Sequence, residues 1–446
     1  MGDKVSEGPE KRPEIAEWLG NLPLVRRHWR VFAVCSAGLM LDSIDIQVMG
    51  LLAPHIAREW SVGAELSAAL FALTAAGMFI GAAASGPAAD RWGRRPTMIA
   101  MLALFSAASL GCGLAIGPTG LLAFRFVAGI GLGAFLPVDT TYLAEILPTR
   151  RRGTLLGLWT VGLPLGNLAA IAMAAFLLPL GGWQLVLIVC AAPAVIIVIL
   201  AMGLPESPVY LARSGRPQQA ERAASWFGDG SANTFTIAAA PPAVRIRFGA
   251  LLERRFRRRS VSLWVLWFAW NFSYFGAVLW IPTVLLLSQP AASTIAILAA
   301  MAVAGVAGRL SSAFVVDRLG RRRTVILCGS GAAIAALALS MAGNPLGIVI
   351  AAAALGFLQD GGASSVVTWT PELYPTDVRA TAVGVANAVG RIGAVISPLV
   401  SGALIVFSPA AVFAAFAFVY GIGVMAAIFL TIETRDSQLD DLANAS

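Results

Sequence analysis

Charged side chains are scarce in this chain. Asp, Glu, Lys and Arg together make up 13% of its 446 residues, whereas hydrophobic residues make up 58%. Soluble globular domains contain roughly 25% charged residues, which cover the surface that faces water. With so few charged residues, this chain cannot form such a surface. Its composition therefore excludes an ordinary soluble protein and indicates a membrane protein.

Histidine and cysteine are also scarce. The chain has 2 histidines, one near each end of its first apolar run, and 4 cysteines, each in a different apolar run. This arrangement matches neither a metal site nor a disulfide framework. No nucleophile and base form a catalytic pattern, and no Walker sequence for nucleotide binding is present. We therefore expect no enzyme, no ATP-driven pump, no metal and no cofactor.

Long apolar runs, by contrast, fill most of the chain. We count roughly twelve runs that are long enough, at about 20 residues, to cross a hydrocarbon core of about 30 Å. They cover 30–54, 66–88, 97–116, 120–145, 154–179, 183–203, 261–287, 293–316, 324–342, 345–373, 380–407 and 409–431. Their unbroken apolar character predicts α-helices rather than the alternating strands of a membrane barrel.

The positive charges lie in alternate loops between the runs. Arginines cluster in the loops after the second, fourth and eighth runs and in the stretch 205–259, whereas the opposite loops carry only Arg58. Because positively charged loops stay in the cytoplasm, both termini and the central loop are predicted to be cytoplasmic. The net charge of +8 follows from this asymmetry. The arginine run at 254–259 directly precedes a span, so we do not expect nucleic-acid binding.

The two halves of the chain repeat each other. Residues 90–99 return as residues 317–326, 227 positions later, with seven of ten residues identical. Glu145 and Glu372 begin a second pair of similar motifs at the same offset. Two unrelated motif pairs with one offset indicate a duplicated half, a recurring plan in secondary transporters. We predict an N-terminal segment at 1–25, helical bundles at 26–204 and 255–435, a linker at 205–254 and a tail at 436–446.

The repeated motif Asp-Arg-x-Gly-Arg-Arg resembles the signature of the major facilitator superfamily. Pro205-Glu206-Ser207-Pro208 and the two Glu-x6-Arg motifs are similar to the sugar-porter branch. Asp42-x-x-Asp45 resembles the aromatic acid/proton symporters, and Gly390-Arg391-Ile-Gly393 after Pro-Glu-Leu-Tyr-Pro-Thr resembles the nicotinate (niacin) transporters, which are bacterial relatives of the synaptic vesicle glycoprotein 2 group. The resemblance implies an all-α membrane protein with twelve transmembrane helices in two pseudo-symmetric six-helix bundles around a central cavity.

Two acidic residues, Asp42 and Asp45, lie deep in the first run. A charge at the bilayer centre costs roughly 2.5–3.5 kcal/mol even on lenient scales, so both residues are candidates for function. Their i, i+3 spacing places them on one helix face, where neighbouring carboxylates in a low dielectric favour the binding of a proton. The sugar-porter resemblance matches Asp45 and Arg125 with a proton-coupling aspartate and arginine. A permanent structural ion pair is the alternative.

Arg391 lies near the middle of the eleventh run, and Asn387 lies one helical turn earlier. A guanidinium matches a carboxylate in charge and geometry, so we expect these residues to bind an anionic substrate. Asp360 lies at a similar depth in the tenth run and is the alternative partner of Arg391, for which a substrate would then compete. Arg309 has two candidate partners, Asp42 and Asp360.

Four further residues are candidates for contact with an aromatic substrate. Asn271 and Tyr274 share a helix face in the seventh run, where they offer hydrogen bonds and a stacking surface. Trp159 lies in the fifth run, and Trp369 lies near the end of the tenth. The alternative for such aromatic residues is a place in lipid or at the membrane interface.

Charged residues of the cytoplasmic loops form a candidate gate. In both halves the repeated motif can pair with the Glu-x6-Arg motif and with nearby helix ends, and such pairs would set the balance between outward- and inward-facing states. Asp139 is expected to form a structural or gating pair as well. The candidate gate residues are Asp90, Arg91, Arg94, Arg95, Glu145, Arg152, Asp317, Arg318, Arg321, Arg322, Glu372 and Arg379.

Together these features predict the uptake of a small aromatic monocarboxylate, nicotinate first, by proton-coupled alternating access in the bacterial inner membrane. Symport is physically reasonable because one proton offsets the charge of a carboxylate that enters against a negative interior. The expected partners are the substrate, protons and lipid, and the expected working unit is a monomer. A sugar, polyol or other organic-acid symporter, an exporter and a non-transporting receptor stay open as alternatives.

Overall fold

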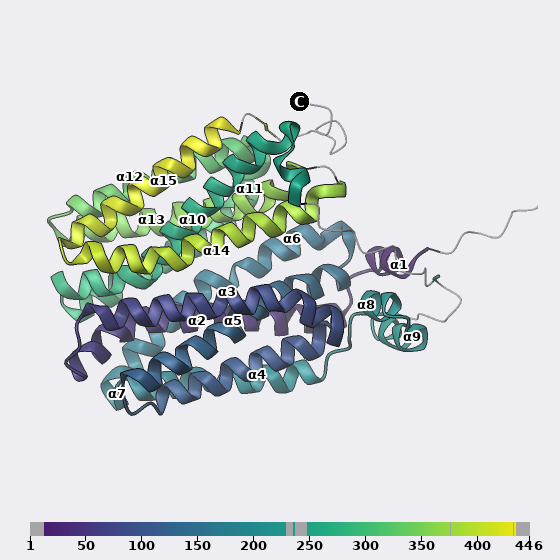
Figure 1. Cartoon of the computed structure of the whole chain (residues 1–446), viewed down its shortest axis with the longest axis horizontal. Coiled ribbons are helices and arrows are strands. Elements are labelled where there is room, and N and C mark those ends of the chain that lie inside the picture. The colour runs from purple at the N-terminus through teal and green to yellow at the C-terminus, as the bar shows by residue number, and fades with distance from the viewer. Residues whose placement is uncertain (1–12, 229–234, 237–247, 375, 431, 434–446) are drawn as a thin grey trace, which may run out of the picture.

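The computed structural model describes residues 13–228, 235–236, 248–374, 376–430 and 432–433. Within these residues the chain is helical almost throughout, apart from an isolated β-bridge between Glu14 and Thr236. The helices, labelled in Figure 1, are α1 (Ile15–Asn21), α2 (Arg26–Glu59), α3 (Ala64–Trp92), α4 (Arg94–Gly113), α5 (Pro118–Ile146), α6 (Thr149–Thr160), α7 (Gly162–Met202), α8 (Pro208–Arg213), α9 (Pro217–Ser225), α10 (Arg254–Ser288), α11 (Ala291–Leu319), α12 (Arg321–Met341), α13 (Pro345–Glu372), α14 (Thr376–Ile405) and α15 (Pro409–Phe429), with a short 3-10 helix at Phe248–Leu252.

Eleven helical stretches of the described chain are long and apolar enough to cross a membrane. One of them, Thr149–Met202, comprises α6 and α7 and has 54 residues, about twice the length that one crossing needs. Its backbone leaves the helical conformation at Gly181 and Gly182, and Gly182 has a φ of 66°, which glycine adopts readily because it lacks a Cβ. The stretch turns back there and crosses twice. The described helices therefore make twelve crossings, as predicted from the sequence.

The crossings form two bundles, one from α2 to α7 and the other from α10 to α15 (Figure 1). In the first bundle α3 packs against α5, and in the second α11 packs against α13. Glycine permits the closest approach at equivalent positions. A Cβ atom at Gly81 would lie 2.0 Å from the Ile130 carbonyl oxygen, and one at Gly308 would lie 2.1 Å from that of Phe357. Both contacts are related by the 227-residue offset, so the repeat in sequence is also a repeat in packing.

The two bundles contact each other through α2 with α10, α3 with α14 and α7 with α11. Phe71, near the start of α3, meets Trp280 of α10 edge to face, with the ring centroids 5.7 Å apart. Both rings are buried. This contact joins the two bundles in the half of the molecule that lies away from α1.

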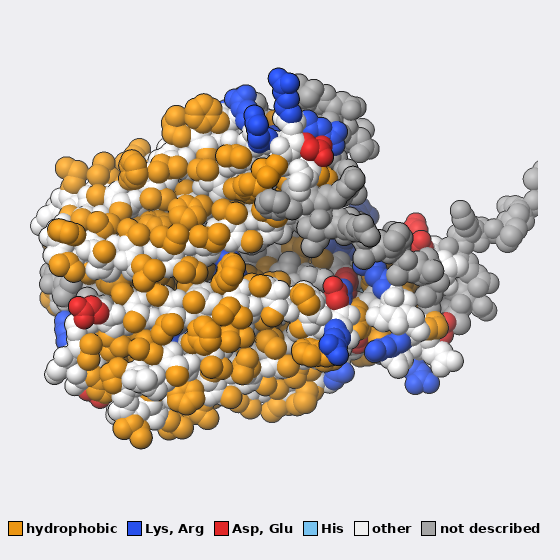
Figure 2. Space-filling view, viewed as in Figure 1, with side chains coloured by type: hydrophobic (Ala, Val, Ile, Leu, Met, Phe, Trp, Pro, Cys, Tyr) orange, Lys and Arg blue, Asp and Glu red, His pale blue; other side chains and the backbone are white. Residues whose placement is uncertain are grey.

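Apolar side chains cover the flank of both bundles, whereas charged side chains gather mainly at the end that holds α1, α8 and α9 (Figures 1 and 2). Large apolar residues such as Phe176, Phe314 and Phe407 are 74%, 74% and 82% exposed. A broad apolar surface of this kind is unfavourable in water and is suited to lipid. The first described residues and the end of α15 both lie at the charged end, and its assignment to the cytoplasm stays a prediction.

Candidate functional site

Asp45 of α2 and Arg125 of α5 form a buried ion pair. The Nη1 and Nη2 atoms of Arg125 donate to the two carboxylate oxygens of Asp45 over 2.9 and 2.8 Å. Arg125 Nε donates to Thr74 Oγ1 over 3.2 Å, and Ser109 Oγ donates to Asp45 Oδ1 over 3.4 Å. The side chains of Asp45 and Arg125 are 2% and 1% exposed. In so dry an environment a bidentate pair is strong, and the loss of either partner is costly.

Asp42 lies one helical turn before Asp45 and is also buried. Its Oδ1 atom accepts no hydrogen bond from the described residues. The charges that act on it come from Arg391 and Asp45. Because an ionised carboxylate without donors is costly to bury, this position is suited to a group that binds and releases a proton.

Arg391 of α14 is half-buried and makes no hydrogen bond or ion pair with another described residue, although the charge of Asp42 acts on it. Asp360 of α13 accepts instead from Arg309 Nε of α11 over 2.7 Å, and both of those side chains are buried. Of the two candidate partners of Arg309, the structure therefore selects Asp360. The alternative pair of Arg391 with Asp360 does not form among the described contacts, which leaves the Arg391 guanidinium available to a ligand.

Tyr274 of α10 connects the two bundles. Its hydroxyl interacts with Arg309, the partner of Asp360, and with Asn167 of α7. Ser43 Oγ of α2 donates to Asn167 Oδ1 over 2.7 Å. Tyr274 therefore lies in a polar cluster that joins a charged pair of the second bundle to the first bundle.

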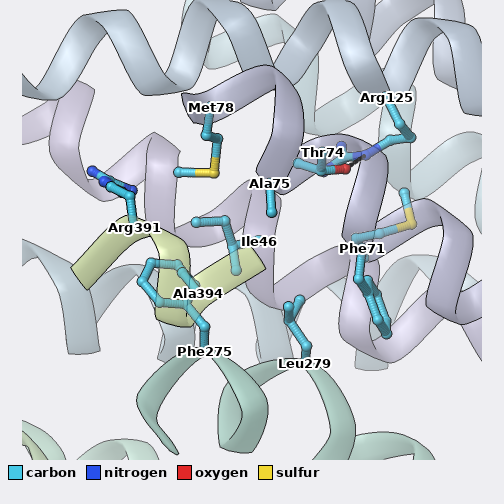
Figure 3. A pocket seen from close by; sticks show the side chains of 11 residues that line it. Ile46, Phe71, Thr74, Ala75, Met78, Arg125, Phe275, Leu279, Arg391 and Ala394 are labelled. Atoms are coloured by element: carbon cyan, nitrogen blue, oxygen red, sulfur yellow. Dashed lines mark hydrogen bonds between the residues drawn. The ribbon is translucent and has the colours of Figure 1, made fainter. Parts of the chain in front are cut away.

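A narrow pocket with a cavity volume of about 20 Å³ lies between the bundles, beside these charged groups. Arg391 lies at one end and Arg125, with Thr74, at the other (Figure 3). The wall between them is mainly aliphatic and aromatic. The lining residues are Ile46, Met49, Phe71, Thr74, Ala75, Met78, Arg125, Phe275, Leu279, Arg391 and Ala394. A cationic end and an apolar wall match the chemistry of a carboxylate attached to a ring, for which this narrow pocket would have to widen.

The two asparagines of the sequence-predicted substrate site do not line this pocket. Asn387 is exposed, and its Nδ2 lies 3.5 Å from the Val383 carbonyl oxygen of the same helix. Asn271 Nδ2 donates to the Trp267 carbonyl oxygen over 3.0 Å. Both amides thus bond to their own helix one turn earlier, and their contact with substrate stays a prediction.

The two tryptophans of the predicted site are buried outside the pocket lining. Trp159 Nε1 donates to Asp139 Oδ2 over 3.0 Å, and Asp139 is fully buried. Cys35 also interacts with this carboxyl group. The described partners of Asp139 are therefore Trp159 and Cys35 rather than an arginine. Trp369 is fully buried as well, and its Nε1 has no partner among the described residues.

Sequence reasoning missed the apolar wall of the pocket. Phe275 and Leu279 of α10 and Phe71 and Met78 of α3 line it. Each resembles dozens of other apolar residues in apolar spans, so its type carries no signal of its own. Phe275 directly follows Tyr274, and a rotation of one residue about the helix axis decides which of the two side chains reaches the pocket.

At the charged end, the repeated motifs form ion pairs within each bundle. In the first, Arg94 contacts Asp90 over 2.9 Å and Glu145 over 3.3 Å. In the second, Arg321 contacts Glu372 over 3.1 Å. The pairs Arg94–Glu145 and Arg321–Glu372 are equivalent under the internal repeat.

Two further glutamates, which were absent from the predicted gate, complete these clusters. Glu206 accepts from the backbone nitrogens of Arg94 and Arg95 over 3.1 and 3.2 Å, and Glu433 accepts from that of Arg321 over 2.8 Å. Burial raises the pKa of Glu206 above its usual value, although the backbone hydrogen bonds oppose this shift. The two glutamates are again 227 residues apart, so the repeat offset was the signal that could have identified Glu433.

Three other arginines of the predicted gate donate hydrogen bonds to backbone carbonyl oxygens at helix ends. The bonds are Arg95 Nε to the Ala201 carbonyl oxygen over 3.4 Å, Arg322 Nη2 to that of Ile428 over 2.9 Å, and Arg152 Nη2 to that of Leu147 over 3.1 Å. Each of these bonds stays within one bundle. Arg91 and Arg318 are exposed, whereas the side chains of Asp317 and Arg379 lie outside the described part of the chain.

Residues 49–445 match the family described as Sugar (and other) transporter. The chain belongs to this family of the major facilitator superfamily. Two similar proteins extend this finding. The niacin transporter NiaP of Acinetobacter baylyi is 32% identical over 395 residues, which cover 87% of this chain and 89% of that protein. The gallate transporter of Pseudomonas putida is 31% identical over 402 residues, which cover 88% and 89%.

The solved structure of the xylose transporter XylE from E. coli, in a partially occluded inward open conformation, has a TM-score of 0.73 and 19% sequence identity. The match covers 93% of this chain and 100% of the XylE chain. This likeness shows the fold alone, and it agrees with the two bundles described above. The transporter is therefore a multi-pass membrane protein of the major facilitator type.

Proposed function

We propose that this transporter imports a small aromatic monocarboxylate, with nicotinate as the first candidate, together with protons by alternating access. The similar proteins that are named for niacin and gallate support this class of substrate. The pocket supports it independently, since a guanidinium lies at one end and the Phe275 ring lies in the wall beside it.

The available guanidinium of Arg391 is the observation that carries this proposal. Three arginines lie deep in the described spans, and two of them, Arg125 and Arg309, are bound to aspartates. Arg391 has no such bond and lines the pocket between the bundles. A charge in the membrane is expensive, and a substrate carboxylate would neutralise it with two parallel hydrogen bonds.

Proton coupling follows from the competition between Asp42 and the substrate. Ionised Asp42 attracts Arg391, since each charge acts on the other. A proton on Asp42 removes this nearby negative charge, which would otherwise repel a substrate carboxylate at Arg391. The substrate in turn removes the cation that favours ionised Asp42. Proton and substrate therefore promote each other's binding, as thermodynamic linkage requires, and the loaded site gains no net charge.

A sugar is a weaker candidate for this pocket. Sugars carry many hydroxyl groups, each of which needs hydrogen-bond partners when it is buried. Most of the lining residues are apolar. We propose further that the transporter acts as a monomer in the bacterial inner membrane, with both termini in the cytoplasm. The positively charged loops support this orientation.

Uptake of radiolabelled nicotinate into proteoliposomes tests the proposal. With an inward proton gradient the wild-type protein should accumulate nicotinate, and a protonophore should abolish accumulation. Arg391→Gln should lose uptake. Arg58→Gln, which removes an exposed arginine near the C-terminal end of α2, should retain it. The proposal is wrong if functional protein takes up no aromatic acid, or if the accumulation of nicotinate does not depend on the proton gradient.

A further inference from the structure

The hydrogen-bonding groups that line the pocket are strongly biased toward donors. Arg391, Arg125 and Thr74 are the polar residues among the lining side chains (Figure 3). A guanidinium carries five N–H donors and no acceptor. Two of the three polar lining residues can therefore only donate hydrogen bonds to a ligand.

The third residue, Thr74, is largely occupied. Its hydroxyl donates to the Leu70 carbonyl oxygen over 2.7 Å and accepts from Arg125 Nε over 3.2 Å. A hydroxyl oxygen has two acceptor lone pairs, so one lone pair stays unused on a side chain that is only 7% exposed. The Asp45 carboxylate lies behind this end of the pocket, where it is bound by Arg125 and Ser109, and it does not line the pocket.

Donors, in contrast, are in surplus at both ends of the pocket. None of the N–H groups of Arg391 donates a hydrogen bond to a described residue. Arg125 donates three hydrogen bonds, to Thr74 and Asp45, and interacts with Cys112. Measured against the five donors of a guanidinium, one N–H is left over. A ligand atom that accepts hydrogen bonds can therefore be satisfied, whereas a ligand hydroxyl finds almost no acceptor for its proton.

We infer that, within the proposed function, the pocket selects aromatic carboxylates whose rings carry acceptors or no polar group, and rejects those with phenolic hydroxyls. A pyridine carboxylate belongs to the favoured class, because its ring nitrogen only accepts. Benzoate is tolerated, since its ring is apolar. A hydroxybenzoate is disfavoured, because its O–H would lose a hydrogen bond to water and gain none in the pocket.

The size of this discrimination follows from measured selectivities of apolar pockets. An apolar pocket rejects an isostere with an added hydroxyl by no more than roughly 100-fold. The spare lone pair of Thr74 reduces this effect. We therefore expect 4-hydroxybenzoate to bind at least about tenfold more weakly than benzoate, which corresponds to about 1.4 kcal/mol.

Isothermal titration of the purified transporter with benzoate, nicotinate, 3-hydroxybenzoate and 4-hydroxybenzoate tests this selectivity. The first two acids should bind, and both hydroxybenzoates should be weaker than benzoate by about tenfold or more. If the hydroxybenzoates bind as tightly as benzoate, the selectivity argument is wrong while the proposed function stands. If none of the four acids binds, the proposed function itself fails.

An engineered acceptor provides a gain-of-function test. Met78 lies in the pocket wall between Arg391 and Thr74 (Figure 3). Met78→Gln adds a carbonyl acceptor and should improve the affinity for 4-hydroxybenzoate relative to benzoate by about fivefold or more. Met78→Leu, which adds no acceptor, should leave the ratio unchanged. Ala75→Ser is a smaller variant for the same purpose. Unchanged ratios in both acceptor variants would contradict the inference.

Discussion

Replacing one partner of the Asp45–Arg125 pair should destabilise the protein more than replacing both. Asp45→Asn leaves a cationic Arg125 that is 1% exposed and has lost its counter-charge. Breaking a buried pair in this way costs about 3–5 kcal/mol, whereas exchanging both partners for apolar residues of similar volume is often neutral. Asp45→Leu combined with Arg125→Met should therefore recover most of the loss.

Unfolding of the purified protein in mixed detergent micelles, followed by tryptophan fluorescence, measures these differences. Asp42→Asn is the matched control, because Asp42 lies on the same helix and is also buried, but its Oδ1 accepts no hydrogen bond from the described residues. We expect this control to change the unfolding free energy by less than about 1 kcal/mol. If Asp45→Asn is as mild as Asp42→Asn, or the double variant is worse than either single change, the structural argument for this pair is refuted.

Three shorter predictions concern other parts of the molecule. Arg391→Gln should weaken nicotinate binding by roughly 10- to 100-fold, as expected for a charged hydrogen bond, and an unchanged Kd in titration would contradict its role. Trp159→Phe should lower the unfolding free energy by about 1–3 kcal/mol, because buried Asp139 loses a donor; equal stability would argue against this bond. Because burial raises the pKa of Glu206, ionisation costs stability as the pH rises above the usual value for glutamate. The Tm of the wild type relative to Glu206→Gln should therefore fall from acidic to neutral pH, and a pH-independent difference would contradict this account.

The fold followed from the sequence because its signals are long-range and redundant. The offset of 227 residues relates motif to motif, and it also relates the Gly81 contact to the Gly308 contact. The number of spans depends on one local feature, the break in the helix at Gly181 and Gly182. The length of the apolar stretch alone does not separate the two crossings on either side of this break, because their helices are almost continuous along the chain.

The candidate site was only partly accessible from the sequence. Buried charges stand out in apolar spans, so Asp42, Asp45, Arg125 and Arg391 could be selected by their cost alone. Pairing depends on helix rotation and tilt, which sequence spacing does not fix. Arg309 and Asp360 lie 51 residues apart, and no local pattern distinguished this pair from the alternatives.

Proton uptake on nicotinate binding tests the central claim most directly. The purified transporter is mixed with nicotinate in weakly buffered solution while a pH indicator records the change. Because the charges of ionised Asp42 and of the substrate carboxylate both act on Arg391 and repel each other, the wild type should take up protons as nicotinate binds, and Asp42→Asn should bind nicotinate with little or no uptake. Nicotinate binding without proton uptake by the wild type, or equal uptake by Asp42→Asn, would contradict the account.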